Sequence, residues 1–203
     1  MRVRLTFTKQ GALRYTGHLD LHKIIERSLR RAKLPLAYSQ GYHPQPRLNL
    51  AAALPLGFSS RAEVMDIWLN EDVQDVPDQL KEHVPPGLTI LDAKPVDDRE
   101  PSLQSQVIAA EYEVEITEAN SASDLTEKIA SILATKSIPR VRRKKEYDLR
   151  PLVEELTVTG DNKLFMRLTA REGATGRPEE VLDVMGIPRE DARIERTRIL
   201  FSD

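Results

Sequence analysis

The order of the hydrophobic patterns along the chain constrains its fold more than any other feature. Val3, Leu5 and Phe7 alternate with polar residues in RVRLTFT, which is typical of a half-buried strand. A helical pattern occupies residues 18–33, and short extended pieces broken by Gly and Pro follow over residues 36–60. AEVMDIWLN then predicts a strand that is buried mostly on one face, VPDQLKEHVPPG a short helix and LTILDAKPV a strand. The order is strand, helix, strand, strand, helix, strand.

The second half repeats this order, although its residues do not visibly repeat those of the first. AEYEVEIT alternates as a strand, and Leu125 and Ile129 have helical spacing within residues 121–135. Residues 138–170 predict two long strands that turn near Gly160, and RPEEVLDVMG and ARIERTRILF predict a helix and a closing strand. We therefore predict an α+β protein of two tandem ferredoxin-like domains, each with an antiparallel sheet and its helices on one face.

The predicted division of the chain follows from its length and from one polar segment. A length of 203 residues suits two domains of about 100 residues each. The segment VDDREPSLQS is polar and rich in turn-forming residues, and such segments commonly separate domains. We place an N-terminal domain at 1–97, a linker at 98–105 and a C-terminal domain at 106–203.

The composition excludes several classes of protein. Hydrophobic residues make up 40% and charged residues 31% of the chain, which is ordinary for a globular protein. The chain has no cysteine, so it holds no disulfide and no cysteine-ligated iron–sulfur cluster, and we expect no cofactor. No apolar run reaches the roughly 18 residues of a membrane span, and the start lacks the apolar region of a signal peptide. We therefore expect a cytoplasmic protein that does not contact membranes.

Charge is unevenly distributed along the chain. Residues 1–62 hold eleven Lys or Arg against Asp20 and Glu26, whereas residues 63–131 hold four basic and 17 acidic residues. The basic front of the chain is a candidate surface for a polyanion. The alternative is that it faces the acidic middle of the chain within the fold.

The predicted helix over residues 18–33 separates its apolar side chains from its basic ones. At about 100° per residue, Leu21, Ile24 and Ile25 fall on one side, where they would pack on the sheet. Four cations fall on the opposite side, and we name them the basic stripe: Lys23, Arg27, Arg30 and Arg31. We predict that the basic stripe faces solvent and binds nucleic acid.

This helix begins in GHLDLHK, which holds two of the four histidines of the chain. With Gly17 as the N-cap, Asp20 falls at the third helical position, where its carboxylate reaches the Gly17 N–H and meets the positive end of the helix dipole. His18 and His22 lie one turn apart and away from Asp20, so a metal bound to both would need a third ligand from elsewhere. We therefore predict a helix cap at Gly17 and Asp20 and no metal site, and we retain His18 as a functional candidate.

A connection with two prolines follows the helix. Pro44 and Pro46 fix the backbone of residues 42–47, which we name the proline loop, and thereby lower the cost of ordering its side chains on binding. Rigid aromatic and cationic groups next to a basic helix suit stacking on a nucleotide and hydrogen bonding to it. The predicted nucleic-acid-binding residues of the loop are Tyr42, His43, Gln45 and Arg47. The alternative, which we favour for Tyr38, is that the tyrosines complete the core.

Signals for an enzyme are weak. The chain has no P-loop, no G-x-G-x-x-G, no H-E-x-x-H and no G-x-S-x-G motif. His18 or His43 would suit the general base of a metal-independent RNA endonuclease. A second basic run, Arg140 to Lys145, is interpreted mainly as solvated strand, with contact to a polyanion as the alternative. We predict no catalytic residue.

The segment LRYTGHLDLHKIIERSLRRAKLPLAYSQGYHPQPRLNLAAALPLG resembles the radical-SAM-linked bacterial domain family of unknown function. RRKKEYDLRPLVEEL and GRPEEVLDVMG are similar to its later motifs, so the resemblance covers nearly the whole chain. The family pattern has Ser at position 17, which would be a capping-box residue, and an apolar residue at position 22. It has Asn-Pro-His-Pro at residues 43–46. The resemblance implies an accessory module that works with a radical SAM enzyme, and it implies no established activity.

Three functional hypotheses follow. The first is a non-catalytic module that binds RNA or presents an RNA-related substrate through the basic stripe and the proline loop. The second is a protein-interaction module for a radical SAM partner, in which the basic stripe meets an acidic surface. The third is the RNA endonuclease. Because the chain has no cysteine, the cluster of a radical SAM enzyme would be ligated by the partner.

Overall fold

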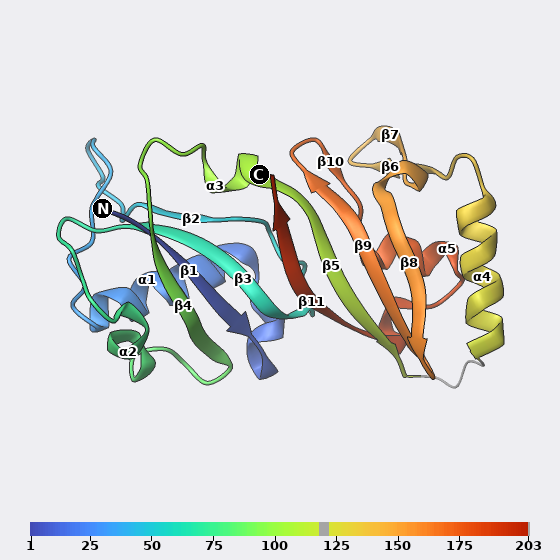
Figure 1. Cartoon of the computed structure of the whole chain (residues 1–203), viewed down its shortest axis with the longest axis horizontal. Coiled ribbons are helices and arrows are strands. Elements are labelled where there is room, and N and C mark those ends of the chain that lie inside the picture. The colour runs from blue at the N-terminus through green and yellow to red at the C-terminus, as the bar shows by residue number, and fades with distance from the viewer. Residues whose placement is uncertain (118–121, 203) are drawn as a thin grey trace. The chain divides into compact units, whose positions relative to one another are not determined.

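The computed structural model describes residues 1–117 and 122–202 (Figure 1). The chain forms two compact units, Met1–Val107 and Ile108–Asp203, and is a mixed α+β protein with mostly antiparallel strand pairing. Among the described residues, no helix is long and apolar enough to cross a membrane.

The first unit is a four-stranded sheet with helices. Its strands lie in the order β4, β1, β3, β2, and all three pairings are antiparallel. Its elements are β1 (Arg2–Lys9), the 3-10 helix η1 (Gly11–Tyr15), α1 (His18–Arg31), β2 (Leu48–Leu50), β3 (Ser59–Trp68), α2 (Val76–Lys81), β4 (Leu88–Val96) and α3 (Leu103–Gln106).

The core of the first unit lies between the sheet and α1. Val3, Leu5 and Phe7 alternate along β1 toward the interior, as the RVRLTFT pattern predicts. Leu21 and Ile25 of α1 belong to the same buried cluster. Burial of side chains of this size contributes about 1.5–3 kcal/mol each, so this contact fixes which face of α1 is left for solvent (Figure 1).

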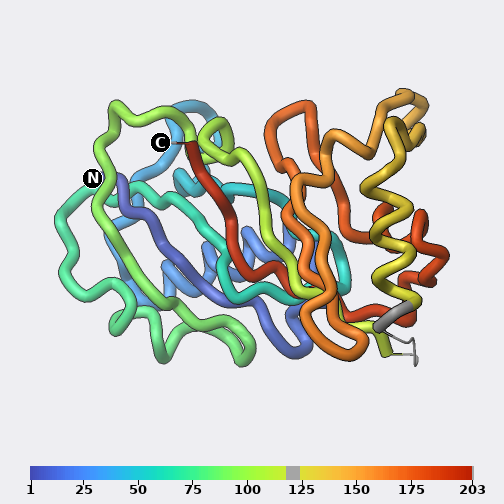
Figure 2. Tube along the Cα trace, turned by 45° about the vertical axis from the view of Figure 1, so that its right-hand side comes forward, coloured from blue at the N-terminus to red at the C-terminus, as the bar shows by residue number. Residues whose placement is uncertain are grey.

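The second unit has its own sheet, in which β5 lies between β9 and β11, while β8 and β10 both pair with β9. The path of the chain can be followed in Figure 2. Its elements are β5 (Val107–Ile116), α4 (Ala122–Ala134), β6 (Pro139–Arg142), β7 (Lys145–Asp148), the 3-10 helix η2 (Arg150–Leu152), β8 (Val153–Gly160), β9 (Lys163–Arg171), β10 (Ala174–Thr175), α5 (Pro178–Val184), the 3-10 helix η3 (Arg189–Asp191) and β11 (Ala192–Phe201). The predicted start of the first helix, Ser121, lies outside the described residues.

The first of the two long strands predicted within residues 138–170 is wrong. A separate hairpin of β6 and β7 occupies its first part, and β8 begins only at Val153 after the 3-10 turn η2. Arg143 and Lys144 make the hairpin turn with φ of 49° and 66°. This left-handed conformation is unusual for Arg and Lys, so the sequence gives no turn signal there.

The segment predicted as a linker, residues 98–105, belongs to the first unit. The Arg2 guanidinium donates hydrogen bonds to the carbonyl oxygens of Glu100 and Pro101 at 2.9 and 3.0 Å. Leu103 of α3 is fully buried. These contacts hold the polar segment against the body of the unit.

The strand β3 is buried on both faces along its middle, from Glu63 to Ile67, and the predicted burial on mainly one face is wrong. The second face is occupied by Asp66, which is fully buried, and by the arginine side chains that reach it from β1. An ion pair closes the face that the sequence assigns to solvent.

Candidate functional site

The helix α1 begins as its sequence indicates. Gly17 is the residue before the first turn, and the N–H of Leu21 donates to the Gly17 oxygen at 2.9 Å. Asp20 lies in the first turn, and its Oδ2 lies 3.5 Å from the position that a Cβ on Gly17 would occupy. The carboxylate therefore turns back toward the helix start, where the helix dipole favours negative charge.

The basic stripe lies on the solvent side of α1. All four of its side chains are exposed. Arg30 forms an ion pair with Glu26, one turn earlier, at 2.9 Å. Within residues 1–117 and 122–202, no ion pair or hydrogen bond is formed by the side chains of Lys23, Arg27 or Arg31. Three cations of the basic stripe therefore keep their charge available for an external anion.

The proline loop projects from a short backbone ladder. Tyr38 pairs with Pro46 in an antiparallel bridge, and the Ser39 N–H donates to the Gln45 oxygen at 2.8 Å. The Gln45 N–H donates in turn to the Ser39 hydroxyl at 3.0 Å. Tyr42 is 95% exposed, and its ring meets the ring of His43 edge-on at 5.1 Å. A large aromatic ring displayed on a loop that is fixed at its base is suited to stacking on a planar ligand.

Two cation–π contacts link this loop to its surroundings. The Arg30 guanidinium lies 5.4 Å from the ring centre of Tyr38, so one end of the basic stripe meets the base of the loop. The Arg47 guanidinium lies 4.6 Å from the ring centre of Trp68 on β3. The structure thus joins Arg30 and Arg47 to the same loop, whereas no contact joins His18 or Asp20 to it among the described residues.

The histidines of GHLDLHK do not form a metal centre within the described part of the chain. His18 and His22 are half-buried on α1, and His43 is exposed on the proline loop. No group of three or more His, Cys, Asp or Glu side chains is placed to hold a metal ion within residues 1–117 and 122–202.

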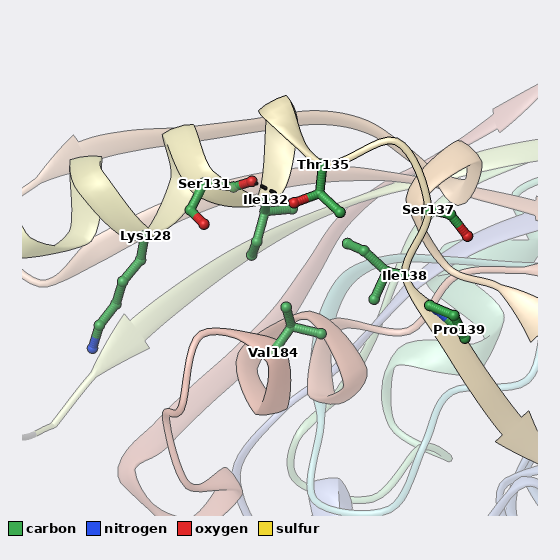
Figure 3. A pocket seen from close by; sticks show the side chains of 8 residues that line it. All are labelled: Lys128, Ser131, Ile132, Thr135, Ser137, Ile138, Pro139 and Val184. Atoms are coloured by element: carbon green, nitrogen blue, oxygen red, sulfur yellow. Dashed lines mark hydrogen bonds between the residues drawn. The ribbon is translucent and has the colours of Figure 1, made fainter.

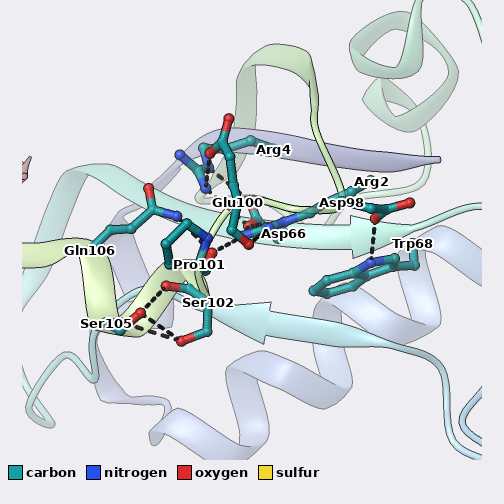
Figure 4. A network of polar contacts seen from close by, with 10 residues as sticks. All are labelled: Arg2, Arg4, Asp66, Trp68, Asp98, Glu100, Pro101, Ser102, Ser105 and Gln106. Carbon is teal, nitrogen blue, oxygen red and sulfur yellow. Dashed lines mark hydrogen bonds and ion pairs between the residues drawn. The ribbon is translucent and has the colours of Figure 1, made fainter. Parts of the chain in front are cut away.

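A buried polar network in the first unit escapes the sequence analysis (Figure 4). The Asp66 carboxylate accepts hydrogen bonds from Arg2 Nε and Arg4 Nε, both at 2.8 Å. Asp66 and Arg2 are buried, and Arg4 is 20% exposed. Trp68 donates from Nε1 to Asp98 at 3.1 Å, which orients the ring that carries Arg47. The signal was the pairing of two arginines on the polar face of one strand with an aspartate on another.

A second polar cluster lies in the second unit, around Arg142. Its Nε donates to Glu180 at 3.0 Å, and its Nη2 donates to the Tyr147 hydroxyl at 3.0 Å. Burial of Arg142 opposes its charge, but the hydrogen bond and the charge of Glu180 outweigh this and raise the pKa of Arg142. Burial and the hydrogen bond to Glu180 raise the pKa of Tyr147 above its ordinary value of 10.0. The cluster therefore stays in one protonation state at neutral pH.

A pocket of about 340 Å³ lies between α4 and Val184 of α5 (Figure 3). Its lining is largely apolar, and its cation, Lys128, is paired with Asp124 at 3.2 Å. The Thr135 hydroxyl donates to the Ser131 oxygen of the preceding turn at 2.8 Å. The polar groups of this pocket are therefore engaged within the helix, and we assign it no function.

Comparison with known proteins gives one family and one distant structure. Residues 2–178 match a family described as "Uncharacterized protein conserved in bacteria (DUF2344)". No curated protein sequence matches the chain. A chain in "Crystal Structure of a Cbf5-Nop10-Gar1 Complex" is similar at 8% identity with a TM-score of 0.48, over 99% of this chain and 50% of that chain. Our chain thus spans about half of that one, and a similarity at this level supports no argument about function.

Proposed function

We propose, for a chain that belongs to this family of uncharacterized proteins conserved in bacteria, that it is a non-catalytic cytoplasmic module that binds RNA or presents an RNA-related substrate. The binding surface is the basic stripe together with the proline loop. The module works beside a radical SAM protein, as the resemblance in its sequence implies. In each unit we classify the fold as ferredoxin-like, and the strand order β4, β1, β3, β2 of the first unit supports that classification.

One observation carries the proposal. Lys23, Arg27 and Arg31 are exposed on one helix face and have no ion-pair partner in the described part of the chain, whereas Arg2 and Arg4 are used within the fold. The acidic middle of the chain therefore neutralises part of the basic front and leaves the stripe free. Phosphates that displace counterions from such a row of cations bind with strong salt dependence.

We expect the double charge reversal Arg27→Glu/Arg31→Glu to weaken binding of a single-stranded RNA at least about tenfold at 0.1 M salt, because two phosphate contacts become repulsive. The slope of log affinity against log salt should fall by about two units. Fluorescence anisotropy with a labelled 20-nucleotide RNA measures both quantities.

A matched control keeps the net change in charge and moves it to another part of the same unit. Lys81 and Lys94 are exposed and lie on α2 and β4, so Lys81→Glu/Lys94→Glu should leave the salt slope nearly unchanged. Equal losses in the two double variants would show that net charge, and not the basic stripe, sets the affinity. Recovery of shortened RNA that depends on His18 or His43 would favour the endonuclease.

A second candidate function rests on exposed apolar side chains near the start of α1. Tyr15, Leu19 and Leu56 are 67%, 74% and 63% exposed. The Gly57 N–H donates to the Arg14 oxygen at 2.7 Å, which places the segment of Leu56 beside that of Tyr15. Exposed apolar groups of this size are a feature of protein interfaces, and they favour the protein-interaction module for a radical SAM partner. Co-purification of that partner after RNase treatment, in a protein with no RNA affinity, would select this function.

A further inference from the structure

The second unit contains a pocket of about 620 Å³ that the proposed function does not use. It lies between the β6–β7 hairpin and the turn that joins β9 to β10 (Figure 1). Cationic, acidic and apolar groups line it: Arg142, Arg143, Lys145, Glu146, Tyr147, Asp148, Leu152, Gly173, Ala174, Thr175 and Arg177. The volume is far greater than a single phosphate needs and falls in the range of small-molecule sites.

The cations of this pocket divide into engaged and available ones. Arg142 is held by Glu180, Tyr147 and the Thr175 carbonyl oxygen, the last at 2.9 Å. Arg143 and Lys145 are exposed, and their side chains make no ion pair or hydrogen bond within the described residues. Two positive charges therefore stand at the pocket without internal compensation.

The carboxylates of the pocket offset these charges only in part. Asp148 accepts the backbone N–H groups of Ile138 and Arg150 at 2.7 and 3.0 Å. The hydrogen bond from Ile138 lowers the pKa of Asp148, so that side chain stays ionised and committed to the backbone. Glu146 is the remaining carboxylate of the lining.

The turn that carries Arg143 is strained. Arg143 and Lys144 have φ of 49° and 66°, and a left-handed conformation costs non-glycine residues about 1–2 kcal/mol each. Strain of this kind collects at binding sites, where the surrounding structure fixes it. Here it sets the direction in which the hairpin presents its cations.

A flat surface lies beside the available charges. The Arg142 guanidinium lies 4.7 Å from the ring centre of Tyr147, and the hydrogen bonds to Glu180 hold it there. Guanidinium planes and tyrosine rings are the groups on which nucleobases stack. Leu152 and Ala174 add apolar surface to the lining.

We propose that this pocket binds a nucleoside 5′-monophosphate unit, with the phosphate at Arg143 and Lys145 and the base against the Arg142–Tyr147 surface. The unit is supplied either as a free nucleotide or as the 5′ end of an RNA strand. The site lies within the second unit and does not depend on the basic stripe.

The test is a calorimetric titration of the full chain with AMP, inorganic phosphate and adenosine. We expect AMP to saturate with a Kd of about 1 mM or tighter and to bind at least about tenfold more tightly than phosphate or adenosine, because it uses both halves of the pocket. The variant Arg143→Asn/Lys145→Gln should weaken AMP binding about tenfold or more, since Asn tolerates the left-handed turn. The matched variant Lys136→Gln/Lys163→Gln removes two exposed cations elsewhere in the unit and should leave it unchanged.

Two results would overturn the proposal: no saturable binding of AMP up to about 10 mM, or equal loss in both double variants. In the Arg27→Glu/Arg31→Glu background, a 5′-phosphorylated RNA that competes with AMP identifies the strand end as the ligand. Failure of the same RNA to compete identifies the free nucleotide. AMP binding that survives in this background while RNA binding is lost keeps this site separate from the proposed function.

Discussion

Replacement of Asp66 by alanine is expected to lower the free energy of unfolding by about 3–5 kcal/mol. Asp66 is fully buried and accepts from Arg2, which is 2% exposed, and from Arg4. Without the carboxylate, the Arg2 guanidinium stays buried with no counter-charge, and desolvation of an unpaired charge is expensive. Urea denaturation followed by circular dichroism measures the loss.

Two further variants make this prediction specific. Asp92→Ala removes the partner of an exposed pair with Lys94, and it should cost at most about 1 kcal/mol because such pairs are screened by water. The double variant Arg2→Met/Asp66→Leu replaces the buried pair by apolar groups and should be more stable than Asp66→Ala. If Asp66→Ala costs no more than Asp92→Ala, the buried pair contributes nothing to the stability of the unit.

The second large effect is expected for Gly87→Ala, with a loss of about 2–4 kcal/mol. Gly87 has φ of 91°, and a Cβ there would lie 2.4 Å from the Gln10 carbonyl oxygen. The Gln10 N–H also donates to the Gly87 oxygen at 2.7 Å, so the two backbones cannot separate without loss of that hydrogen bond. The left-handed conformation alone costs about 1–2 kcal/mol for a residue with a side chain, and the steric overlap adds to it.

Gly173→Ala separates these two costs. Gly173 has φ of 77° but no atom within 4 Å of the position of an added Cβ. It should therefore show the conformational cost of about 1–2 kcal/mol without the overlap. Thermal denaturation of the two variants gives the comparison, and equal shifts in Tm would remove the role assigned to the contact with Gln10.

Much of the secondary structure was predictable because local periodicity determines it. The strand of RVRLTFT and the helix that begins at His18 depend on side chains that alternate between core and solvent at fixed spacing, and the structure has both. The predicted helical pattern extends to Lys33, whereas α1 ends at Arg31. The short helices α2 and α5 also lie where their proline starts indicate.

The differences arise where distant residues override a local pattern. Residues 98–105 are polar, as in a linker, yet the buried Arg2 side chain uses their carbonyl oxygens as acceptors. Asp66 was indistinguishable in sequence from a solvent-facing strand residue, because its arginine partners lie more than 60 positions earlier. The β6–β7 hairpin turns through Arg143 and Lys144, which carry no turn signal.

The candidate site was partly accessible to the same reasoning. The basic stripe follows from helical spacing alone, and its exposure on α1 agrees with that spacing. The contacts of Arg30 with Tyr38 and of Arg47 with Trp68 require tertiary structure. The pocket beside Arg143 is assembled from β6, β7 and the β9–β10 turn, so no sequence window contains it.

The contacts of Arg2 also bear on when the first unit can complete its fold during synthesis. Arg2 donates to carbonyl oxygens that follow it by 98 and 99 positions, so the earliest residues of the chain wait for nearly the last residues of their unit. Contacts between residues so far apart in sequence form late and slow the search for the native state. A nascent chain that has exposed residues 1–97 therefore still lacks two acceptors for its buried guanidinium, and the first unit closes only once residues 100 and 101 have left the ribosome.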